Sequence, residues 1–120
     1  MNYLIIFIGG GIGAMSRYAL QGIVYEFTGA AFPYGTLMVN VLGCFLIGVF
    51  AGASEKFIID PQWRIFLTIG LLGGFTTFSS LGYETFALFR DGEILLALAN
   101  IFGSVLIGLL SVWLGFFLIK

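Results

Sequence analysis

Charge is what this chain of 120 residues has least of: five lysines and arginines stand against six aspartates and glutamates, and the formal net charge is −1 at pH 7. Histidine is absent, and the single cysteine, Cys44, has no partner for a disulfide. These absences exclude zinc sites built from histidine and cysteine, histidine-dependent catalysis and a disulfide framework. A basic patch for nucleic acid is excluded as well, because the charge balance is slightly acidic.

Apolar residues are what the chain has in excess. Hydrophobic residues make up 60% of the sequence and charged residues 9%, and the mean hydropathy is +1.11. No soluble domain of ordinary composition approaches these values. A bilayer core about 30 Å thick takes roughly 20 apolar residues per helical span. The sequence therefore predicts an all-α integral membrane protein, with one domain over residues 1–120 and four transmembrane helices.

The few charged residues divide the sequence into apolar segments. The N-terminal segment is expected to be a helix and not a secretory signal, because no basic residue precedes it and glycines interrupt it. Asp60 followed by Pro61 predicts the start of a helix, since aspartate caps free N–H groups and proline fits the first turn. The predicted spans cover residues 3–25, 34–54, 62–89 and 94–119.

Orientation in the membrane is only weakly encoded. The connections are too short to cross a bilayer, so an even number of spans places both termini on one side. Lys56, Arg64 and Lys120 then lie on the terminal side, against Arg90 and Arg17 on the other. Because the lysine and arginine balance of short loops sets orientation, this count predicts insertion in both orientations. If two oppositely inserted chains pair, the result is a two-fold dimer with a closed interface. The alternative is one topology fixed by a single decisive residue.

Polar side chains inside the spans are the best indicators of function, because in lipid each needs a partner or a water-filled cavity. Thr36 and Asn40 lie one helical turn apart in the second span, and Asn100 and Ser104 do so in the fourth. The third cluster is the run GGFTTFSS at residues 73–80. Small residues at helical spacing, which let helices approach closely, are Gly9 and Gly13, Gly48 and Gly52, and Ser104, Gly108, Ser111 and Gly115.

The run at residues 73–80 predicts a break in the third helix. Paired glycines and β-branched threonines both lower helix propensity. Roughly ten residues at about 1.5 Å each separate Arg64 from Gly73, which places the break near the bilayer midplane. Broken backbone at that depth is tolerated where it is buried or lines an aqueous cavity, and its carbonyls can coordinate a cation. The alternative is a simple kink with its hydroxyls bonded back to the helix.

A pathway of amides and hydroxyls suits a small ion of either sign, but the scarcity of carboxylates within the spans favours an anion. Cation pathways usually use acidic rings, whereas only Glu84 falls within a span. Amide and hydroxyl hydrogens and the positive ring edges of Phe75 and Phe78 are available to an anion. Arg17 either reaches an interface or attracts the anion, and the sequence does not separate these roles. Two further hydroxyls that extend away from the break are those of Ser79 and Ser80.

Three motifs in order resemble the Fluc (CrcB-type) fluoride channels: GGGIGAMSRY at 9–18, GTLMVNVLG at 35–43 and GGFTTFS at 73–79. The similarity covers all four spans. It implies a fluoride-selective passive channel that exports fluoride to relieve its toxicity, located in a bacterial inner membrane. It also implies an antiparallel homodimer with two pathways and a structural sodium ion at the dimer centre.

The resemblance assigns roles to individual residues. The pore asparagine corresponds to Asn40, its neighbouring threonine to Thr36, and the first of two phenylalanines that face the ion to Phe78. The first hydroxyl of a track on the fourth helix corresponds to Ser104. The structural sodium is expected on backbone carbonyls of both chains, at Gly73 and Thr76.

The sequence departs from the family pattern at three positions. Leu81 stands where the second phenylalanine is expected, and Asn100 and Gly108 stand where many members carry tyrosine or a second serine. These departures bear on ion coordination and leave the fold and the dimer unaffected.

Two other functions compete with a channel. A four-helix dual-topology multidrug transporter would share the size and the weak charge bias, but it needs a membrane-embedded carboxylate and the first helix has none. A non-conducting membrane assembly subunit would explain the small-residue patterns but not the polar break. An enzyme is least favoured, because no nucleophile and base can be paired.

Overall fold

The computed structural model describes residues 2–119. Met1 and Lys120 therefore lie outside the described residues. Both belong to the predicted domain, and Lys120 also belongs to the charge count. Four stretches of the chain are helical, long and apolar enough to cross a membrane, which confirms the predicted all-helical membrane class. The helices are α1 (Asn2–Thr28), α2 (Tyr34–Lys56), α3 (Pro61–Arg64), the π-helix η1 (Ile65–Leu72), α4 (Gly73–Phe75), α5 (Phe78–Arg90) and α6 (Ile94–Ile119).

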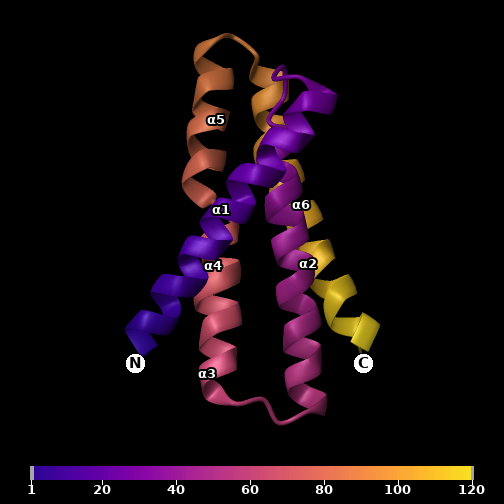
Figure 1. Cartoon of the computed structure of the whole chain (residues 1–120). Helices are drawn as coiled ribbons and strands as arrows, with labels where there is room; N and C mark the ends of the chain where they lie inside the picture. Colours follow the sequence, from indigo (N-terminus) through magenta and orange to yellow (C-terminus); the bar gives the residue numbers. More distant parts are fainter. Residues whose placement is uncertain (1, 120) are drawn as a thin grey trace.

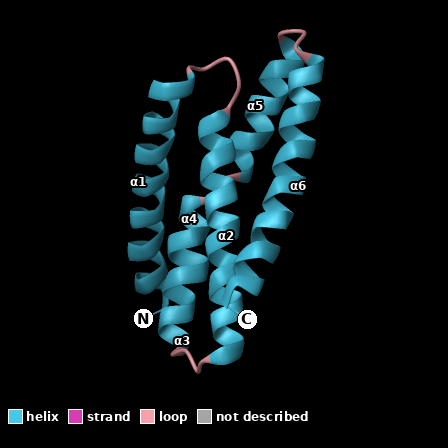
Figure 2. Cartoon of the chain, turned by 90° about the vertical axis from the view of Figure 1, so that its right-hand side faces the viewer, coloured by secondary structure: helices cyan, strands magenta, loops and turns pink. Residues whose placement is uncertain are grey.

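The chain runs up and down as a bundle (Figure 1). Both labelled ends of the chain lie at the end of the bundle where α2 is joined to α3, and the other two connections lie at the opposite end (Figures 1 and 2). The longest dimension is 49 Å, which matches a bilayer of about 40–45 Å including its headgroups. The chain is therefore a multi-pass membrane protein whose segments α3 to α5 together form the third crossing.

The third crossing begins at the predicted cap. The Asp60 side chain accepts a hydrogen bond of 2.8 Å from the Gln62 N–H, and Pro61 occupies the first turn. The helix then widens into the π-helix η1, which the sequence did not predict. Because π-helical turns are rare and occur frequently near functional sites, η1 directs attention to the residues that follow it.

Helical geometry stops for two residues immediately after α4. Thr76 has φ −83° and ψ 159°, and Thr77 has φ −148° and ψ 115°, so both backbones are extended. The Thr77 hydroxyl then accepts a hydrogen bond of 3.1 Å from the Ser80 N–H and caps α5. The third crossing thus consists of two helical parts joined by an extended pair of residues.

The interior of the bundle is polar and its outer surface is apolar. The largest fully buried side chains are Val39, Asn100 and Thr36, two of which are polar. Large apolar side chains such as Leu95, 81% exposed, cover the outside. This arrangement suits a protein whose solvent is hydrocarbon, since outward-facing apolar side chains lose nothing in lipid.

Glycines let the helices pack backbone to backbone. A Cβ atom on Gly48 would overlap the Val112 backbone of α6, and one on Gly115 would overlap the Phe45 backbone of α2. On the other side of the bundle, Gly13 lies equally close to the backbone of η1 and α4. The predicted small-residue surfaces therefore serve packing within one chain.

Substituting a packing glycine should lower stability. In Gly115→Ala the new methyl group meets a backbone carbonyl that cannot rotate away, and overpacking of this kind costs about 1–3 kcal/mol. Gly103 on the same helix has open space where a methyl group would lie, so Gly103→Ala is the matched control. Thermal unfolding of the purified proteins should show a lower midpoint for Gly115→Ala alone. Equal midpoints would contradict the close α2–α6 packing.

Candidate functional site

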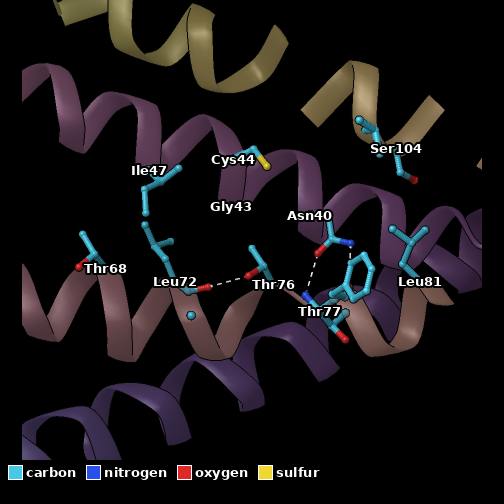
Figure 3. Close-up of a pocket in the computed structure, with 13 residues that line it drawn as sticks. Asn40, Gly43, Cys44, Ile47, Thr68, Leu72, Thr76, Thr77, Leu81 and Ser104 are labelled. Carbon is cyan, nitrogen blue, oxygen red and sulfur yellow. Dashed lines mark hydrogen bonds between the residues drawn. The ribbon is translucent and has the colours of Figure 1, made fainter. Parts of the chain in front are cut away.

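The extended residues between α4 and α5 are held by a side chain of α2. The Asn40 amide nitrogen donates to the Thr77 carbonyl at 3.0 Å, and the Asn40 amide oxygen accepts from the Thr77 N–H at 2.8 Å. Figure 3 shows both bonds side by side. An amide fits this position because it offers one donor and one acceptor to the two backbone groups of a single extended residue. The two backbone groups of Thr77 are therefore satisfied by Asn40.

Two carbonyls at the interruption are released from their usual partners. In a continuous α-helix, the Thr77 N–H would bond to the Gly73 carbonyl, and the Ser80 N–H to the Thr76 carbonyl. Here the Thr77 N–H bonds to Asn40, and the Ser80 N–H bonds to the Thr77 hydroxyl at 3.1 Å. Neutral carbonyl oxygens such as these are ligands for hard cations, as in other discontinuous membrane helices. The residues predicted to hold sodium are thus chemically suited to it.

Arg17 reaches the same interruption from α1. Its Nε donates to the Gly74 carbonyl at 3.2 Å, and the contact is partly buried. In a continuous helix that carbonyl would accept from the Phe78 N–H, which now begins α5. A cation at the carbonyl end of the preceding helix is favourable. The structure therefore adds a backbone contact to the two roles predicted for Arg17, which stay predictions.

A cavity of about 340 Å³ lies beside the interruption, between α2, the third crossing and α6. It brings together Asn40, Phe78 and Ser104, three residues predicted for the pathway, with Gly73 and Thr76, the two predicted for sodium. The Phe78 side chain is 80% exposed in the single chain. Apolar residues complete the walls, and the ones labelled in Figure 3 are Ile47, Leu72 and Leu81.

Thr36 lies in a neighbouring polar cluster that joins α1, α2 and α5. Its hydroxyl donates to Glu84 Oε2 at 2.9 Å and accepts from Gln21 Nε2 at 3.1 Å. The Tyr25 hydroxyl donates to the same Glu84 oxygen at 3.4 Å. Within residues 2–119 this cluster is separate from the lining of the cavity. The Glu84 carboxylate is therefore engaged by hydroxyl groups.

Three other predicted pathway residues flank the interruption without lining the cavity, as judged over residues 2–119. Phe75 is buried, and its ring lies against Gly43. Ser79 is exposed, with its hydroxyl 3.5 Å from that of Thr77, and Ser80 is half-buried. The structure thus places these side chains around the break and leaves their part in conduction a prediction.

A second polar contact, between α5 and α6, was missed by the sequence analysis. The buried Asn100 amide nitrogen donates to the Thr85 hydroxyl at 2.9 Å. Thr85 carries no spacing signal that links it to Asn100. Gln21 carries none that links it to Thr36, and Tyr25 none that links it to Glu84. One sequence feature could have drawn attention to Gln21 and Tyr25: their four-residue spacing puts both on one helical face.

Comparison with known proteins identifies the family. A family model described as "CrcB-like protein, Camphor Resistance (CrcB)" matches residues 4–116. A protein of Geotalea daltonii named "Fluoride-specific ion channel FluC" is 52% identical over 114 residues, which are 92% of this chain and 92% of that protein.

Relatives from other organisms carry the same name. One from Geotalea uraniireducens is 51% identical over 118 residues, covering 98% of this chain and 95% of that protein. One from Thermus thermophilus is 47% identical over 115 residues, covering 96% and 92%. A match of this length and identity leaves no segment of the four-helix bundle outside the comparison, and the chain belongs to the CrcB-like family.

Proposed function

We propose that this chain is a fluoride-selective passive ion channel that exports fluoride and so relieves its toxicity, and that it is not an enzyme. Relatives at about half identity are named as fluoride-specific ion channels. The observation that carries the proposal is the amide of Asn40 fixed at the helix interruption, beside a cavity that also contains Phe78 and Ser104. The membrane is proposed to be a bacterial inner membrane.

The cavity offers hydrogen-bond donors without a fixed positive charge. One N–H of the Asn40 amide is used on Thr77, and an amide nitrogen has a second hydrogen that remains for an anion. The positive edge of the Phe78 ring and the Ser104 hydroxyl add to it. Neutral donors replace part of the hydration shell yet bind weakly enough for the ion to leave, which conduction requires. We propose that the path continues past Thr36, Phe75, Ser79 and Ser80.

Two copies in opposite orientations are proposed to form the working unit, with two pathways. The weak charge bias supports dual insertion. In one chain the Phe78 ring is largely exposed, and the cavity wall it belongs to is open. A second copy against this face would cover the ring and close the pathway from lipid, which a single thin bundle cannot do.

A structural sodium ion is proposed at the dimer interface, held by the carbonyls of Gly73 and Thr76 from both chains. The support is chemical: the N–H groups that would bond to these carbonyls in a continuous helix bond elsewhere. When bound, the cation supplies a positive charge that lets carbonyls from both chains face one another. Asn40 and Thr77 keep the carbonyls available by holding the backbone out of the helix.

Fluoride release from liposomes is the direct test. Purified protein reconstituted in vesicles loaded with fluoride should release it rapidly when a potassium ionophore carries the balancing charge. Chloride-loaded vesicles form the paired measurement and should release almost nothing. A folded sample that releases neither ion would overturn the proposed channel.

Asn40→Asp should suppress fluoride efflux at least about tenfold, which corresponds to roughly 1.4 kcal/mol of added barrier. An aspartate cannot donate to the Thr77 carbonyl, and its charge repels an anion in the cavity. Ser54→Asp places the same charge on α2 at a residue whose hydroxyl bonds only within its own helix, to Phe50, and should conserve efflux. The pair is compared in the liposome assay. Full efflux through Asn40→Asp would remove Asn40 from the pathway.

Sodium removal should weaken both the dimer and the conduction. Protein exchanged exhaustively into a large organic cation should dissociate more readily in detergent and release fluoride more slowly, because facing carbonyls lose their cation. Restoring sodium should reverse both effects, and the same ionic strength of organic salt should not. Dimer stability and efflux that do not respond to sodium would count against the carbonyl site.

A further inference from the structure

Polar side chains hold α5 on two sides. Glu84 accepts a hydrogen bond from Thr36 of α2, and the next residue, Thr85, accepts one from Asn100 of α6. α5 begins directly after the extended residues, so no continuous helix fixes its position. Its distance from α6 therefore depends on contacts such as the one between Thr85 and Asn100.

The contact continues into the backbone of α5. The Thr85 hydroxyl, which accepts from Asn100 Nδ2 at 2.9 Å, donates its own hydrogen to the Leu81 carbonyl at 2.7 Å. Since that single hydrogen is used, the hydroxyl can only accept from α6, and the amide must turn its nitrogen toward it. A relay thus runs from Asn100 through Thr85 to Leu81.

The orientation of the Asn100 amide leaves its oxygen without a hydrogen bond, and this energetic cost indicates the role of the residue. Asn100 is 1% exposed, and its Oδ1, buried in the described part of the chain, has no hydrogen-bond partner there. A leucine, which has the same branching at Cγ, would bury no unsatisfied acceptor. What an asparagine provides and a leucine does not is the donor to Thr85.

The relay ends at the cavity. Leu81, whose carbonyl receives the last bond, lines the cavity from α5, and Ser104, one turn after Asn100, lines it from α6 (Figure 3). Fixing Asn100 to Thr85 therefore fixes the separation of these two walls.

We propose that Asn100 is a positioning residue, which through Thr85 sets the width of the pathway between Leu81 and Ser104 and so the preference for fluoride over the larger chloride ion. The inference rests on the proposed channel function and extends it to a residue outside the cavity.

The test compares Asn100→Leu, Thr85→Val and the double variant with the parent chain. Both changes keep the branching of the side chain and remove the relay from opposite ends. Ser111→Ala is the matched control, because Ser111 is a buried hydroxyl of α6 that bonds only within its own helix, to the Ile107 carbonyl. The fluoride-to-chloride ratio of efflux is measured in liposomes, and backbone hydrogen exchange of residues 78–90 is measured in detergent.

Each single variant should lower the fluoride-to-chloride ratio about tenfold, the effect expected from losing one interhelical hydrogen bond of ordinary strength. The double variant should lower it no further, since both changes break one relay. Exchange in residues 78–90 should become faster in all three variants, and Ser111→Ala should match the parent chain in both measurements.

Other outcomes overturn the proposal. A lower unfolding midpoint with an unchanged ratio in Thr85→Val would show that the contact serves stability alone. Additive losses in the double variant would show that Asn100 acts independently of Thr85. If Asn100→Leu fails to fold, Thr85→Val decides by itself, because it leaves Asn100 in place. A parent chain that releases no fluoride refutes the channel and the selectivity role together, and hydrogen exchange then still decides whether the relay holds α5.

Discussion

Satisfying the backbone of Thr76 and Thr77 is the constraint on which the rest of the structure depends. In hydrocarbon an uncovered N–H or carbonyl has no water to bond to, so an interrupted helix survives only where protein groups take over. Asn40 supplies a donor and an acceptor to Thr77, and Arg17 covers the Gly74 carbonyl. These contacts come from α2 and α1, so the positions of both helices are tied to the interruption.

Hydrogen bonds within the chain also determine which polar groups of the interior remain available to an ion. Hydroxyls of Thr36 and Tyr25 donate to one oxygen of Glu84, and they do so away from the cavity. The cavity itself keeps an amide hydrogen, a hydroxyl and an aromatic edge. Neutral donors of this kind suit a small anion in transit, since no fixed positive charge holds the ion in place.

The sequence predicts most of the fold because charge is so scarce. Span number follows from where the charged residues fall, and the start of the third crossing at Asp60 follows from capping chemistry that needs only neighbouring residues. Candidate site residues such as Asn40 were recognisable as isolated polar groups. Their partners were not, because the pairing of Asn40 with Thr77, or of Asn100 with Thr85, depends on how helices far apart in sequence align. The π-helix before the interruption was not predicted either, because nothing in its run IFLTIGLL distinguishes a π-helix from an α-helix.

Backbone packing and the proposed dimer contribute in different ways to a pathway that is closed off from lipid. Glycines bring α2 against α6 and α1 against the third crossing closely enough to remove voids between them, which makes one chain a compact bundle. Close packing leaves no room for an aqueous path through the middle of a single bundle, so the cavity at Asn40 opens at its side, where Phe78 is exposed. A second copy against that side would turn an open groove into a closed path, while each chain keeps its tight interior. In the proposed dimer, tighter packing of each bundle therefore leaves more of the pathway to lie between the two chains.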